Sequence, residues 1–129
     1  MQDQSIENLC AWLRERHDAI LGSEQAAKDS LARGDQKGYA FHMRAKAEQL
    51  ASLVRDATQV LAALPEEPRL EIRSALMRFS SSAAFGLKLD SLFYMSALLY
   101  RDEHPVGDPD NLQVFIDQLA KEGLAFKRA

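Results

Sequence analysis

The sequence has few of the residues that cross-link a fold or bind metals. Among 129 residues there is one cysteine, Cys10, so the chain can form no internal disulfide and no zinc site of several thiolates. Cys10 lies among Leu9, Trp12 and Leu13, a setting typical of a buried, unreactive thiol. We therefore expect no metal, no cofactor and no catalytic thiol.

An excess of basic residues and a long apolar run are also missing. The chain has 16 Lys and Arg against 19 Asp and Glu, a formal net charge of −3, whereas binding to a phosphate backbone favours a basic excess. No apolar run approaches the roughly 20 residues of a membrane span. The first residues are polar and acidic, unlike a secretory signal. These absences predict a cytoplasmic protein that binds neither nucleic acid nor membranes.

Motifs of known catalytic sites are missing as well. The three histidines, His17, His42 and His104, form neither an H-E-x-x-H motif nor the Glu-x-x-His pairs of di-metal bundles. The serines at 80–82 lack the G-x-S-x-G pattern of a nucleophile elbow, and no glycine-rich phosphate loop is present. We therefore predict that the protein is not an enzyme.

Between the 6 glycines and 4 prolines, apolar residues recur with helical spacing. In the first arm the pattern continues through Gly22, which favours one long helix from about Ser5, a candidate N-cap, to Arg33. His17 belongs to this stripe and is predicted to be an imidazole at the core edge. The stripe is formed by Ile6, Leu9, Cys10, Leu13, His17, Ile20, Leu21, Ala27 and Leu31.

A second arm follows the Gly34-Asp35 turn without a linker. Asp35 is the expected N-cap of a helix over 36–64, and two arms of equal length indicate an antiparallel hairpin. The small residues around this turn locally resemble a tetratricopeptide-type hairpin. Because no second copy follows at a 34-residue period, we interpret the turn as the corner of a helical bundle. The apolar stripe of the second arm is formed by Tyr39, Met43, Ala47, Leu50, Leu53, Val54, Ala57, Val60, Leu61 and Leu64.

The remaining chain is also helical in pattern. Pro65 and Pro68 fit the first turn of a third helix, which extends to Tyr100 or breaks at Asp90, where Asp90 would cap a short separate helix. Asp108 followed by Pro109 predicts the start of a last helix, which ends at Gly123. The sequence thus predicts a single all-α domain over 1–129, a bundle of four to five helices built on a long antiparallel hairpin.

The segment "SLFYMSALLY", residues 91–100, carries apolar side chains around its whole circumference if it is helical. Such a helix must be covered on all sides. We therefore expect a protein–protein interaction module, adaptor or regulatory, that forms a two-fold homodimer and also contacts another protein. The expected interaction residues are Trp12, Phe93, Tyr94 and Leu98.

The stretch "FSSSAAFG", residues 79–86, supports an alternative function. Its small residues permit either a close helix crossing at Ala83 or Gly86, or a cavity between helices. Pockets for small molecules are mostly apolar with a few polar anchors. The alternative is therefore a small-molecule-binding bundle with an aromatic and serine-lined pocket around residues 79–100. Its expected lining is Phe79, Ser82, Phe85 and Tyr100.

Overall fold

The computed structural model describes residues 4–127, which form seven α-helices and one short 3₁₀ helix and no strand. The predicted all-α fold is therefore confirmed, with more helices than expected because the second arm is divided. The elements are α1 (Gln4–Ala32), α2 (Gln36–Ala51), α3 (Leu53–Asp56), α4 (Thr58–Ala62), α5 (Glu66–Leu89), α6 (Leu92–Ala97), α7 (Asn111–Glu122) and η1 (Gly123–Ala125).

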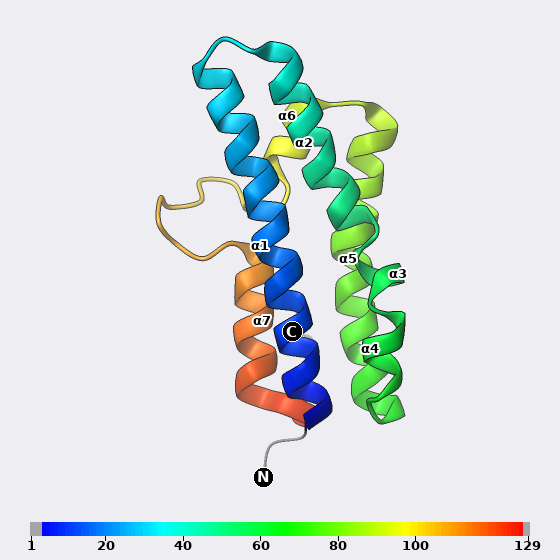
Figure 1. Ribbon diagram of the computed structural model, residues 1–129. Coiled ribbons are helices and arrows are strands. Elements are labelled where there is room, and N and C mark those ends of the chain that lie inside the picture. The colour runs from blue at the N-terminus through cyan, green and yellow to red at the C-terminus, as the bar shows by residue number, and fades with distance from the viewer. Residues whose placement is uncertain (1–3, 128–129) are drawn as a thin grey trace.

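The predicted hairpin forms from α1 and α2, which pack along each other (Figure 1). Gly34 adopts a positive φ of 75°, where glycine carries no steric penalty. The Asp35 carboxylate accepts a hydrogen bond from the Gly38 N–H at 2.9 Å and caps α2, as predicted. α1 passes Gly22 without a break. The predicted cap at Ser5 is wrong, because Gln4 is already helical.

The prediction of one helix over 36–64 is wrong. The chain turns at Ser52 and again at Ala57, which divides the second arm into α2, α3 and α4. At the first turn the buried Ser80 hydroxyl donates to the Leu50 carbonyl at 2.9 Å and accepts from the Val54 N–H at 3.0 Å. These two backbone groups are partners in a continuous α-helix. A side chain from α5 thus stands in for one helical hydrogen bond, an established cause of a helix kink.

The third helix breaks at Asp90, one of the two alternatives left open by the sequence. Asp90 ends α5 in a left-handed conformation with φ 50°, and its carboxylate accepts from Arg44 at 3.0 Å. The cap of α6 is Ser91 instead of Asp90, because the Ser91 hydroxyl accepts from the Tyr94 N–H. α6 ends at Ala97, short of the expected Tyr100. Leu99 then takes a φ of 77°, which turns the chain away from the helix.

The last helix begins two residues later than predicted. Asp110, and not Asp108, is the N-cap of α7, since its carboxylate accepts from the Gln113 N–H at 2.9 Å. The N–H of Asn111 also binds the Leu99 carbonyl at 2.9 Å, which fixes where the helix starts. α7 ends at Gly123, as expected; this glycine has a φ of 57°.

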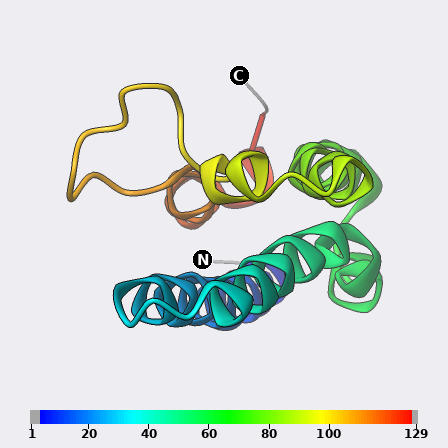
Figure 2. The same ribbon diagram turned by 90° about the horizontal axis from the view of Figure 1, so that it is seen from above.

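Seen from above, the helices lie in two layers (Figure 2). α1 and α2 form one layer; α5, α6 and α7 form the other, with α5 contacting α2 and α7 contacting α1. The loop between α6 and α7 swings out from the body of the molecule (Figure 1). Within residues 4–127, no helix combines the length and apolar character needed to cross a membrane. α5 and α7 thus lie side by side in one layer, and both pack on the layer formed by α1 and α2.

Candidate functional site

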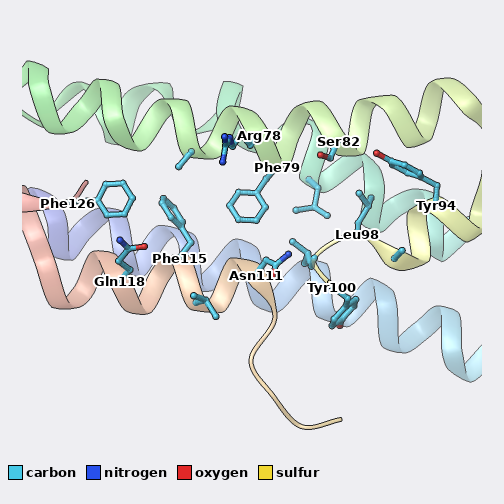
Figure 3. Close-up of a pocket in the computed structure, with 15 residues that line it drawn as sticks. Arg78, Phe79, Ser82, Tyr94, Leu98, Tyr100, Asn111, Phe115, Gln118 and Phe126 are labelled. Atoms are coloured by element: carbon cyan, nitrogen blue, oxygen red, sulfur yellow. The ribbon is translucent and has the colours of Figure 1, made fainter. Parts of the chain in front are cut away.

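A groove of about 530 Å³ runs between α5 and α7 (Figure 3). α5 and α7 supply the two walls, Leu50 of α2 reaches it from the other layer, and the 97–100 segment closes one end. The residues that line it are Leu50, Ala75, Arg78, Phe79, Ser82, Tyr94, Ala97, Leu98, Leu99, Tyr100, Asn111, Val114, Phe115, Gln118 and Phe126.

Three aromatic rings in contact line the groove, of which Phe79 is partly buried and Phe115 and Phe126 are buried. Phe79 of α5 lies 5.9 Å from Phe115 of α7 between ring centroids, and Phe115 lies 5.4 Å from Phe126, edge to face. Phe126 reaches the groove because the chain turns at Gly123 and runs through η1. The Phe79–Phe115 contact joins the α5 and α7 walls, and aromatic contacts of this kind are favourable.

The polar residues of the groove lie on both walls. Arg78 and Ser82 are one turn apart on α5, while Asn111 and Gln118 belong to α7 (Figure 3). The Gln118 amide donates to the Lys127 carbonyl at 3.2 Å. Arg78 takes part in none of the ion pairs formed within residues 4–127. Its guanidinium group is thus available to a ligand in the groove.

The groove contains three of the four residues expected to line a pocket. Phe79, Ser82 and Tyr100 line it, whereas Phe85 lies outside it, half-exposed, with its ring 5.5 Å from that of Tyr94. The predicted close helix crossing is confirmed at Gly86, where α5 meets α6. A Cβ atom at this position would lie 2.8 Å from Cδ1 of Tyr94.

The four residues expected at an interaction surface lie in different environments. Phe93 on α6 is 85% exposed, while Leu98 is buried in the core. Tyr94 is partly buried and lines the groove. Trp12 is partly buried on α1, with the Arg16 guanidinium 4.8 Å above its ring. Of these four side chains, Phe93 alone is largely open to a partner.

A buried charged cluster lies next to the groove. Lys46 has no exposed surface, and its Nζ atom is 2.8 Å from Oε2 of Glu24, which is also buried. The Tyr100 hydroxyl donates to the other carboxylate oxygen of Glu24 at 2.5 Å. Lys46 also donates to the Ser96 carbonyl at 3.3 Å. Tyr100 belongs to both features, because its ring lines the groove and its hydroxyl binds the cluster.

Burial and pairing oppose each other in this cluster. Burial lowers the pKa of Lys46, and the nearby Glu24 carboxylate offsets part of that effect. For Glu24, burial alone would raise the pKa, but Lys46 and the Tyr100 hydroxyl outweigh it and lower the pKa below the ordinary value. Burial, together with the Glu24 carboxylate, raises the pKa of Tyr100. The carboxylate is therefore held in its charged form and the phenol in its neutral form.

A second buried pair joins the first and last helices. His17 Nε2 lies 2.7 Å from Oδ2 of Asp110, so His17 is a buried, hydrogen-bonded imidazole, as its place on the stripe predicted. Burial would raise the pKa of Asp110, but His17 and the Gln113 N–H outweigh burial and lower the pKa. The pair holds the α6–α7 loop against α1 at the point where α7 begins.

The charged cluster was not predicted, although the sequence contains a signal for it. Glu24 lies four residues after Ile20 and three before Ala27, and Lys46 lies three after Met43 and four before Leu50. Each therefore occupies a stripe position on one arm of the hairpin, where opposite charges can pair across the arms. No such signal marks the polar lining residues Arg78, Asn111 and Gln118. They line one groove only because α5 and α7, which are far apart in the sequence, pack in the same layer.

Other chemistry has little support in the described residues. Burial raises the pKa of the Cys10 thiol, and residues 4–127 contain no group of three or more His, Cys, Asp or Glu side chains placed to share a metal ion. Comparisons of this chain with family models, with curated proteins and with solved structures find no match. The groove, lined by aromatic rings and by Arg78, which forms no ion pair within residues 4–127, is the strongest candidate site.

Proposed function

We propose that this chain is a cytoplasmic, non-enzymatic binding protein that holds a small apolar molecule in the groove between α5 and α7. The observation that carries the proposal is the groove itself. Its volume of about 530 Å³ falls within the range of small-molecule sites, roughly 300–1,000 Å³. Its lining is mainly apolar, with a few polar groups on the two walls, which is the composition such sites have.

A rigid frame supports this proposal. The buried Glu24–Lys46 pair contacts Ser96 and Tyr100, at the segment that closes one end of the groove. The His17–Asp110 pair fixes the start of α7, the other wall. A preformed site loses less entropy when it binds a ligand than a site that must first become ordered. The groove therefore suits recognition of a ligand by shape.

Thermal-shift measurements with a panel of apolar metabolites test the proposal, since a ligand that binds only the native state raises the melting temperature. We expect at least one reproducible ligand, and loss of its effect in Ala97→Phe, which fills the groove from an exposed position. Ala84→Phe, at an exposed position of α5 outside the lining, is the matched control. Equal shifts in both variants and the unchanged protein would place the ligand elsewhere.

Self-association is a second candidate function, favoured by the 85% exposure of Phe93. We propose a two-fold dimer in which this ring is covered by the partner copy, because burial of a large apolar side chain contributes about 1.5–3 kcal/mol. Light scattering after size exclusion measures the mass directly. A mass twice that of the 14.5 kDa chain, reduced to the single-chain value by Phe93→Ser, supports the dimer, and a single-chain mass of the unchanged protein rejects it.

A further inference from the structure

We infer that the groove selects an anionic amphiphile, a molecule with an apolar body and a single carboxylate or phosphate head. This inference rests on the proposed function and adds the chemical class of the ligand. Arg78 binds the head, and the apolar surface that Phe79 and Val114 leave open in the groove receives the body.

The charge of the groove lining favours an anionic ligand. Of the fifteen described residues that line the groove, Arg78 alone carries an ionised side chain, and none is acidic. The whole chain has a net charge of −3, so a cationic groove does not follow from its overall composition. A cation in a lining that is otherwise uncharged favours an anion and disfavours a cation at the same place.

The polar groups of the groove are placed where they can bind a carboxylate or phosphate head. Arg78 and Ser82 line the groove from the α5 wall, and Tyr94 of α6 presents its hydroxyl on the side of Ser82 (Figure 3). The guanidinium group presents several N–H donors in a plane that matches two oxygens of a carboxylate or phosphate. The hydroxyls of Ser82 on α5 and Tyr94 on α6 lie farther along the groove and can donate to further oxygens of the head. The head is therefore expected along the α5 wall.

The apolar surface explains why a simple anion is not the expected ligand. Phe79 of α5 is only partly buried, and Val114 of α7 is 51% exposed, so apolar side chains of both walls are still open to water in the groove. Covering these side chains supplies the main favourable term in binding. A small hydrated anion would leave them exposed to water, and a neutral apolar molecule would leave the guanidinium group without a partner.

Isothermal titration with matched twelve-carbon probes below their micelle concentrations tests the inference on the full chain. The probes are dodecanoate, dodecyl phosphate, dodecanol and dodecyltrimethylammonium, with acetate and inorganic phosphate as heads without a body. We expect the better of the two anionic amphiphiles to bind at least about tenfold more tightly than dodecanol, since charge-assisted hydrogen bonds are about twice as strong as neutral ones. The relative affinity of the two identifies the head.

Two variants assign the selectivity to Arg78. Arg78→Gln should remove most of the preference for the anion over dodecanol while dodecanol binding stays within about twofold. Arg73→Gln, on the same helix but outside the lining, should leave both affinities unchanged. Circular dichroism of each variant confirms that the fold is intact.

The outcomes separate this inference from the function on which it rests. If dodecanol or the cationic probe binds as tightly as the anions, or if Arg78→Gln keeps the full preference, the inference is wrong and the groove still binds apolar molecules. Binding of acetate or inorganic phosphate as tightly as the amphiphiles would also overturn it, because the apolar body would then contribute nothing. If no probe binds at all, both the inference and the groove as a binding site for apolar molecules are rejected.

Discussion

At the scale of single residues, the pairing of Glu24 with Lys46 is an ion pair between two buried side chains. Both side chains are withdrawn from water, and Nζ and Oε2 are 2.8 Å apart. The replacement of a buried ion pair by apolar groups is often harmless, whereas removal of one partner leaves an uncompensated charge. Removal of one of the two side chains is therefore expected to destabilise the fold much more than replacement of both by apolar groups.

We predict that Glu24→Gln lowers the free energy of unfolding by about 3–5 kcal/mol, because the Lys46 ammonium group stays buried without its counter-charge. Urea denaturation measures the change. The double substitution Glu24→Gln with Lys46→Met should recover much of the loss, since it removes the unpaired charge. Glu67→Gln, which breaks the exposed contact between Glu67 and Lys127, should change stability by less than about 0.5 kcal/mol. Equal effects at positions 24 and 67 would contradict the assignment.

At the scale of elements, the helix ends show what local sequence can determine. Asp35 caps α2 as predicted, because the cap, the turn glycine and the apolar stripe all lie within a few residues. The start of α7 was misplaced because Asp110 is selected by His17, 93 residues away in the sequence. The break after α2 was missed for the same reason, since Ser80 of α5 supplies the bridging hydroxyl.

The residues of the candidate site also divide into those with a local sequence signal and those brought together only by the fold. Phe79, Ser82 and Tyr100 could be predicted as lining because their region is rich in small and aromatic residues. Arg78 and Gln118 could not, because they become neighbours of one groove only when α5 and α7 are placed in the same layer. The excess of apolar residues at 91–100 predicted side chains open to a partner, but it did not separate Phe93, which is exposed, from Leu98, which is buried because the chain leaves α6 after Ala97.

The caps of α7 provide a prediction that separates two neighbouring aspartates. Asp110→Ala should lower the free energy of unfolding by about 2 kcal/mol or more, because it removes both the helix cap and the buried partner of His17. Asp108→Ala should change stability by less than about 0.5 kcal/mol, since Asp108 lies outside the helix and its side chain is exposed. Thermal unfolding of both variants measures the difference, and a larger effect at position 108 would restore the cap expected from sequence.

Two glycines within helices should respond oppositely to alanine. At Gly22 a methyl group would have no neighbouring atom within 4 Å, so Gly22→Ala should stabilise α1 by about 0.5–1 kcal/mol through helix propensity. At Gly86 the same methyl group would lie 2.8 Å from the Tyr94 ring, and Gly86→Ala should destabilise by about 1–3 kcal/mol through overpacking. Chemical denaturation of the two variants measures both changes in the free energy of unfolding. Stabilisation by both substitutions would show that α5 and α6 have room to separate.

At the scale of the whole molecule, two buried acids connect stability to pH. Glu24 joins the two arms of the hairpin through Lys46, and Asp110 joins the last helix to the first through His17. For both carboxyl groups, charged and hydrogen-bonded partners outweigh burial and hold the pKa below its ordinary value. Folding therefore favours the deprotonated form of each group.

The sign of the pH dependence follows from these pKa shifts. Because both are lowered in the folded state, their contribution is complete above the ordinary pKa values of about 4.3 and 3.9 and is lost as the pH falls through the folded values. We expect the free energy of unfolding to decline below about pH 5. In Asp110→Asn the decline should be shallower, and an unchanged acid slope would show that Asp110 has no part in it.

The complete enclosure of Lys46 also makes it a natural reporter of transient opening. The chain has six lysines, and the other five, Lys28, Lys37, Lys88, Lys121 and Lys127, are exposed. An amine-selective acylating reagent can therefore modify those five on the native protein, whereas it reaches Lys46 only when the two layers separate. The rate at which the peptide that contains Lys46 gains an acyl group, followed by mass spectrometry, would measure how often the molecule opens under native conditions, without denaturant or an introduced probe.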